Sequence, residues 1–202
     1  MNISILPVDI VTRHLIKPRL DVYYPQLVGL VDHKVERKLN ERIYQQVETM
    51  IKKQGFYENP ETEITGGYEI KTNERNIVSL TNSHYSYSGG AHGLTILRSL
   101  TMNVQTGKVY RLKELFNRGA PYVERVNNII REQIKKRDLP LLSPFQGIAP
   151  NQYFYLADKA LVIYFQLYDL VPYAFGIPYF VISVYEIQDI IDEDGPLGQM
   201  IY

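Results

Sequence analysis

The sequence predicts a single α+β domain over residues 1–202, built on a mostly antiparallel sheet meander. Two long helices and a short C-terminal helix are expected to pack on this sheet. Three observations support this: one long apolar stripe with helical spacing, several segments with period two, and turn residues between them. A chain of 202 residues can fold around one core. The weakest junction is expected near residues 58–62, between an N-terminal strand and helix part and the main sheet part.

The N-terminal part begins with an extended segment, residues 8–24, which Pro18 interrupts. A helix of about six turns is expected next, because apolar residues recur every fourth position while charged residues lie largely off their stripe. The apolar stripe consists of Val31, Val35, Leu39, Ile43, Val47 and Ile51. Gly55 is placed to end this helix.

A meander of four strands is predicted in the middle of the chain, over residues 61–72, 77–87, 94–104 and 109–112. Alternating apolar and charged residues indicate the first strand. The turn residues of 73–76 lead into the second. Glycines at 89, 90 and 93 interrupt the path to the third strand.

The C-terminal part is predicted to mix helices with a hairpin. A short helix around 112–116 precedes a longer one over about 121–137, and residues 138–152 form a long loop with three prolines. Segments 153–156 and 161–167 predict a hairpin, and 177–182 a further strand. Ser183 and Glu186 have the spacing of a capping box, which predicts a last helix to about Ile191.

Composition excludes several classes of function. There are 22 basic and 22 acidic residues, so no net field draws the chain to nucleic acid. The absence of cysteine excludes disulfides and thiolate metal sites. The most hydrophobic segment, Leu161 to Ile177, is too short and too polar to insert in a membrane. Residues 1–7 lack the pattern of a signal peptide. By sequence alone we expect a cytoplasmic chain with no cofactor.

The most distinctive segment is Ser88 to Gly93, which we expect to be a bulge or tight turn that needs glycine. A glycine-shaped loop flanked by tyrosines and a histidine is also a plausible recognition surface. Tyrosine is frequent in contact surfaces, and this chain has 17. The predicted ligand-binding residues are Tyr85, Tyr87, Ser88, Gly89, Gly90, His92 and Tyr173.

A hydrolase is the alternative reading of the same segment. Ser88 and His92 could supply a nucleophile and a base, although they lack the order of a nucleophile elbow. His84 and His92 could instead converge on a metal ion across the glycine break, although no metal-binding motif surrounds them. The structural interpretation is that these are hydrogen-bonded histidines at a strand end. We assign neither catalytic residues nor a metal site.

Several segments, taken in order, resemble a known family: Tyr24-Pro25-Gln26-Leu27-Val28-Gly29 before Leu39-Asn40, Tyr85-Ser86-Tyr87-Ser88-Gly89-Gly90-Ala91-His92-Gly93, Thr106-Gly107-Lys108 before Leu112-Lys113-Glu114-Leu115-Phe116, and Tyr164-Phe165 before Pro172-Tyr173-Ala174-Phe175-Gly176. The set is similar to the bacterial domain-of-unknown-function family 3298 with its N-terminal companion domain. This pair occurs in the extracytoplasmic part of the anti-sigma factor RsiV and in the accessory region of PdaC-type deacetylases.

The resemblance implies an α+β fold and a binding role, because the RsiV domain senses lysozyme by binding it. It carries over no catalytic residues, since deacetylase chemistry belongs to a separate domain. The expected function is therefore a non-enzymatic binding module whose target is a lysozyme-like protein or a cell-wall glycan. The resemblance also implies an extracytoplasmic location. The alternatives are the hydrolase and an intracellular structural or regulatory protein.

Overall fold

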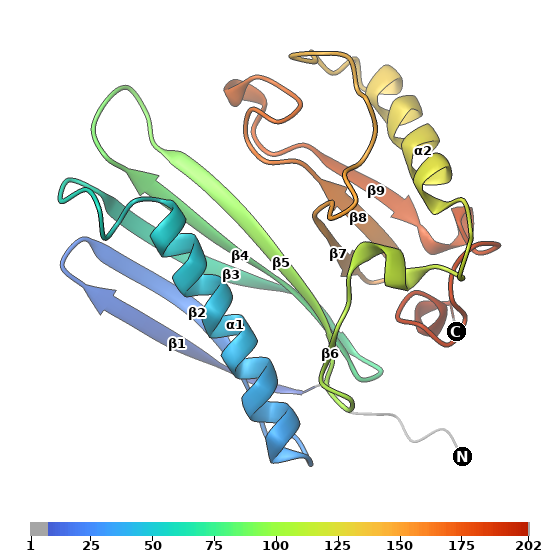
Figure 1. Ribbon diagram of the computed structural model, residues 1–202, viewed down its shortest axis with the longest axis horizontal. Helices are drawn as coiled ribbons and strands as arrows, with labels where there is room; N and C mark the ends of the chain where they lie inside the picture. Colours follow the sequence, from blue (N-terminus) through green and yellow to red (C-terminus); the bar gives the residue numbers. More distant parts are fainter. Residues whose placement is uncertain (1–7, 202) are drawn as a thin grey trace. The chain divides into compact units, whose positions relative to one another are not determined.

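A computed structural model describes residues 8–201 of the chain, which divide into two compact units (Figure 1). The first unit ends at Val109 and the second begins at Tyr110. Residues 58–62, where the weakest junction was expected, lie inside the first unit and connect its helix to the third strand. The α+β class and the mostly antiparallel pairing predicted from the sequence are confirmed.

The first unit is a six-stranded sheet with one long helix (Figure 1). Its elements are β1 (Asp9–Lys17), β2 (Leu20–Val28), α1 (His33–Lys53), β3 (Glu63–Glu74), β4 (Ile77–Tyr87), β5 (Leu94–Asn103) and β6 (Lys108–Val109). The strands follow one another in chain order across the sheet. All neighbours are antiparallel except β2 and β3, which α1 connects and which pair in parallel only from Leu20–Val22 to Ile64–Gly66.

The predicted extended segment 8–24 is a hairpin whose second strand runs on to Val28. Pro18 and Arg19 form its turn, with Arg19 in the left-handed region at a φ of 66°. The helix begins at His33, because the carboxylate of Asp32 accepts hydrogen bonds from the backbone N–H groups of the first turn. Val31, the first residue of the predicted stripe, therefore lies before the helix and is exposed.

The helix α1 packs on one face of the sheet through two apolar clusters. Its buried residues include Leu39 and Ile43 in one cluster and Val47 and Ile51 in the other. The side chain of Asn40 forms two hydrogen bonds of 2.8 Å with the backbone N–H and carbonyl of Leu27. This amide satisfies backbone groups of β2 beyond the short stretch where β2 pairs with β3.

Side chains of β4 point alternately to the two faces of the sheet. Alternation places Val78, Leu80, Asn82 and His84 on the face that α1 covers, and the amide of Asn82 donates a 2.9 Å hydrogen bond to Gln46 of that helix. Residues Ser83 and Tyr85 therefore lie on the opposite face. The position of every β4 side chain relative to α1 follows from this alternation.

The second unit contains a three-stranded antiparallel sheet in the order β7-β8-β9 and the helix α2 (Figure 1). Its elements are the 3-10 helix η1 (Leu112–Leu115), α2 (Tyr122–Lys136), β7 (Phe154–Ala157), β8 (Ala160–Tyr164), η2 (Tyr173–Phe175), β9 (Tyr179–Ser183), η3 (Val184–Glu186) and η4 (Gly198–Met200). The predicted loop over 138–152 is confirmed. Side chains of Gln133 and Arg137 donate hydrogen bonds to backbone carbonyls of the edge strand β9.

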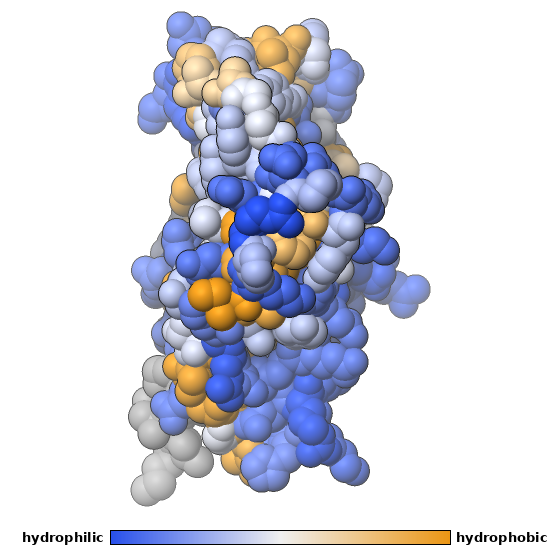
Figure 2. Space-filling view, turned by 90° about the vertical axis from the view of Figure 1, so that its left-hand side faces the viewer, coloured by the Kyte–Doolittle hydropathy of each residue, from blue (hydrophilic) through white to orange (hydrophobic). Residues whose placement is uncertain are grey.

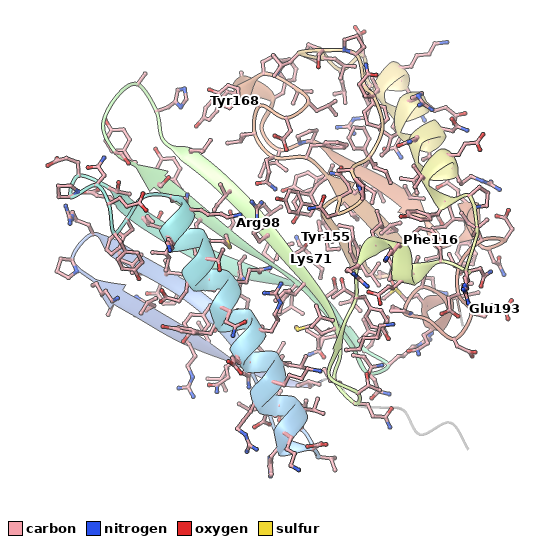
Figure 3. All side chains as sticks on the ribbon, in the orientation of Figure 1. Lys71, Arg98, Phe116, Tyr155, Tyr168 and Glu193 are labelled. Carbon is pink, nitrogen blue, oxygen red and sulfur yellow. The ribbon has the colours of Figure 1, made fainter. Side chains whose placement is uncertain are left out.

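The predicted short C-terminal helix is wrong in type: only single 3-10 turns form there. The capping box between Ser183 and Glu186 is present, yet it opens the three-residue η3. The physical reason lies further along the chain. The N–H of Asp192 donates to the carbonyl of Leu115, the carbonyl of Ile190 accepts from the N–H of Asn117, and Ile191 bridges to Phe116, labelled in Figure 3. Those backbone groups are thus unavailable to a helix.

No helix among residues 8–201 is long and apolar enough to cross a membrane.

Candidate functional site

The segment between β4 and β5 is a glycine loop whose shape is set by its backbone. Gly89 and Gly90 have φ values of +87° and +96°, which L side chains rarely adopt. A Cβ on either would meet nothing within 4 Å, so it is conformation and not crowding that calls for glycine here. The hydroxyl of Tyr87 donates a 3.0 Å hydrogen bond to the carbonyl of Gly90. The positive φ expected of glycine in this segment is therefore present, in a loop of bends between β4 and β5.

A second tyrosine, Tyr85, holds the far end of the loop. Its hydroxyl accepts a 3.2 Å hydrogen bond from the N–H of Gly93. A Cβ at Gly93 would lie 2.2 Å from the carbonyl oxygen of Ser86 and 2.5 Å from Cζ of Tyr85. Gly93 is glycine because the tyrosine ring occupies the space of a side chain. The two tyrosines thus fix the loop from both ends.

The hydroxyl of Ser88 and the ring of His92 each have a structural partner. Ser88 Oγ lies 2.8 Å from the hydroxyl of Thr62, at the end of the α1–β3 connection. His92 Nδ1 lies 3.0 Å from the carbonyl of Gly93, to which it donates when that nitrogen carries the proton. A serine nucleophile needs a base to take its proton. The bond of Ser88 to Thr62 instead ties the loop to the start of β3.

His84 and His92, the two histidines considered for convergence on a metal ion, lie in different surroundings. His84 is fully buried on the α1 face, and burial lowers its pKa to about 4, so the ring is neutral at pH 7. Among the described residues its two ring nitrogens have no hydrogen-bond partner. His92 lies in the exposed loop. Across residues 8–201, no three histidine or acidic side chains are grouped so that they could hold a metal ion.

A groove with a volume of about 420 Å3 lies on the face of β3, β4 and β5 opposite to α1. Its lining residues are Thr65, Gly66, Gly67, Tyr68, Glu69, Thr81, Ser83, Tyr85 and Thr95. Six of these nine residues carry a hydroxyl group, and Tyr85, 42% exposed, is shared with the glycine loop. Glu69 forms an ion pair with Lys71, labelled in Figure 3. The loop and the groove are therefore two parts of one continuous surface of the first unit.

Tyr173, the remaining predicted site residue, belongs to the second unit. It begins η2, and its ring centroid lies 5.6 Å from that of Tyr168, labelled in Figure 3. Tyr168 has a φ of 67°, uncommon for a bulky residue. Phe175, at the end of η2, is 58% exposed.

The groove is the part of the surface that sequence reasoning missed. The available signal was the pair Gly66-Gly67 inside a strand, where glycine is unfavourable and often marks a close approach. Gly66 is explained by the fold, because its Cβ would lie 2.6 Å from the ring of His84. At Gly67, no atom of the part of the chain that the structure describes lies within 4 Å of the Cβ position. On the side drawn in Figure 2, hydrophobic residues form separate patches among hydrophilic ones.

Comparison with known proteins now defines the class of this α+β chain. Residues 15–95 match the family model described as "Deacetylase PdaC", and residues 113–185 match "Protein of unknown function (DUF3298)". The first match lies within the first unit and contains the loop and the groove; the second lies within the second unit. Each unit of the chain is thus similar to a different family model.

Further matches support a similarity to DUF3298 proteins and their PdaC-type companion region. The chain is 26% identical over 188 residues to the anti-sigma-V factor RsiV of Bacillus subtilis, covering 85% of this chain. It spans 65% of the length of that relative. A DUF3298 family protein of Pseudomonas aeruginosa superposes with a TM-score of 0.71 at 15% identity, covering 93% and 94% of the two chains. One from Bacteroides fragilis gives 0.67 at 16% identity, covering 99% of both. These two structures bear on the fold alone.

Proposed function

We propose that this chain is a non-enzymatic sensor or binding module that recognises a protein partner through its glycine loop. The observation that carries the proposal is the way in which Tyr85 and Tyr87 fix the loop backbone while His92 stays exposed. A loop fixed before binding loses little conformational entropy when a partner arrives. Tyrosines beside it add rigid, amphipathic contact area.

The arrangement favours binding over catalysis. The hydroxyl of Ser88 is committed to Thr62, and His84 is buried on the other face of the sheet. The groove beside the loop is open and lined by neutral hydroxyl groups, with Glu69 as its one carboxylate. Such a surface offers contacts and hydrogen bonds.

The target that we propose is an extracytoplasmic protein of the lysozyme kind. The support comes from the relationship to the anti-sigma-V factor RsiV and from the resemblance of the loop motif to a family that senses lysozyme. A cell-wall glycan is the second target that the resemblance implies. Both targets place the chain outside the cytoplasm.

Isothermal titration calorimetry of the purified chain with lysozyme, and separately with peptidoglycan fragments, tests the proposal. We expect a saturable heat of binding with lysozyme and no release of product from either material. Binding to peptidoglycan alone would replace the protein target with a glycan. Binding to neither, together with turnover in a broad esterase screen that His92→Ala abolishes, would establish the hydrolase instead.

A further inference from the structure

Gly67, in the middle of β3, has no structural reason to be glycine. Its φ lies outside the left-handed region, and a Cβ added there would meet no atom of residues 8–201 within 4 Å. Its neighbour Gly66 differs, because a Cβ there would collide with the ring of His84. Glycine weakens a strand by raising the entropy lost on folding. A glycine that neither backbone nor packing requires points to something outside the chain that approaches this spot.

The groove around Gly67 is built from three cross-strand rows on one face of the sheet. The register pairs Thr65, Tyr85 and Thr95 in the first row, Gly67 with Ser83 in the second, and Glu69 with Thr81 in the third. Successive rows are about 7 Å apart, the span of two residues along a strand. Gly67 therefore leaves a gap in the middle of the groove, between an aromatic wall and a carboxylate.

The chemistry of this gap selects one class of ligand. Threonine and serine hydroxyls can both donate and accept hydrogen bonds, as ligand hydroxyls require. The ring of Tyr85 is held in place by its bond to Gly93 and presents a rigid apolar face. The charge of Glu69 is offset by Lys71, so the groove has no net charge to attract an ion. A neutral, polyhydroxylated ring with one apolar face meets all three conditions.

We propose that the groove is a saccharide subsite, in which a neutral sugar ring lies over Gly67 against the ring of Tyr85. The hydroxyls of Thr65, Ser83 and Thr95, which are exposed or half-buried, line this position and bond the sugar hydroxyls. The inference rests on the proposed binding function and adds a ligand class to it. It assigns the glycine loop and the groove to different ligands, with Tyr85 shared between them.

Titration of the whole chain with chitotetraose, cellotetraose and maltotetraose, followed by calorimetry and by chemical shifts of backbone amides, tests this subsite. At least one tetrasaccharide is expected to bind and to shift the amides of β3, β4 and β5. Gly67→Val fills the gap and should weaken that binding by at least about tenfold. Thr95→Val removes one hydroxyl at constant size and should weaken it by about threefold to tenfold.

Glu63→Val is the matched control, since it places the same side chain on the same strand outside the groove. It should leave saccharide affinity within about twofold. Lack of binding by all three sugars, or equal affinity in Gly67→Val, Thr95→Val and wild type, would overturn the subsite. So would a neutral tetrapeptide that binds in the groove while the sugars do not. Lysozyme binding by the same variants is measured separately, so that either proposal can fail alone.

Discussion

At the scale of single residues, Gly67 and Gly93 flank the same surface but are glycine for different reasons. Gly93→Ala forces a methyl group against the Ser86 carbonyl and the Tyr85 ring. We expect this overpacking to cost about 1–3 kcal/mol of unfolding free energy. Gly67→Ala meets no atom and should instead add about 0.5–1 kcal/mol, because alanine loses less backbone entropy.

Urea unfolding of the two variants beside wild type measures both effects. A loss of stability in Gly67→Ala as large as that in Gly93→Ala would mean that Gly67 is needed by the fold. The argument for a ligand over Gly67 would then lose its basis. Unchanged stability in Gly93→Ala would show that Tyr85 is free to move and that the loop is not fixed.

His84 makes the stability of the chain depend on pH. Burial holds its pKa at about 4 in the folded chain, against 6.5 for the free side chain. Between these values the unfolded chain binds a proton that the folded chain excludes. The contribution of the neutral ring to the free energy of unfolding is therefore complete above pH 6.5 and is lost as the pH falls towards 4. The loss amounts to about 3 kcal/mol.

Unfolding free energies measured from pH 7.5 to 4 for wild type and His84→Leu check this dependence. The unfolding free energy of the variant should depend less steeply on pH than that of wild type across this window. The difference in slope should correspond to one proton. Leu142→Ala, at an exposed position without an ionisable group, is the control and should keep the wild-type slope. Parallel curves for wild type and His84→Leu would show that the ring titrates alike in both states.

At the scale of elements, α2 protects the open edge of the second sheet. Gln133 Nε2 and Arg137 Nη1 each lie 2.7 Å from a backbone carbonyl of β9, those of Val181 and Tyr179. An unpaired edge strand is prone to pair with other chains. Each of Gln133→Ala and Arg137→Ala should lower the unfolding free energy by about 0.5–1.5 kcal/mol and increase aggregation on heating.

The neighbouring exposed Lys136→Ala serves as the control for these two variants, since it removes a charge from the same turn. Thermal unfolding monitored together with light scattering reports both quantities. Equal midpoints and equal scattering for all three variants would mean that these side chains do not cover the edge.

Two elements show which features of secondary structure a local sequence pattern can predict. The stripe from Val35 to Ile51 predicted α1 because an amphipathic helix carries its own period. The capping box at Ser183 was predicted correctly as a cap, but the short helix expected after it is only a three-residue 3-10 turn. What ended η3 was pairing between Ile191 and Phe116, and a local pattern cannot reveal a partner 75 positions away.

At the scale of the whole molecule, the loop was predictable and the groove was not. The run from Tyr85 to Gly93 carries its signal in adjacent residues, because glycines and tyrosines that bond one another lie within nine positions. The groove is assembled by the register of three strands, which brings Thr65 and Thr95 to either side of Tyr85. Register depends on pairing across the sheet, whereas the sequence shows only the alternation of apolar and polar residues along each strand.

The central claim is that the fixed glycine loop is a surface for a protein partner. Titration of lysozyme into wild type, His92→Ala and Tyr57→Ala tests it most directly, because Tyr57 is 53% exposed and lies outside both the loop and the groove. We predict that wild type and Tyr57→Ala bind alike and that His92→Ala binds at least about tenfold more weakly. Equal affinity of all three proteins, or binding by none, would contradict the claim.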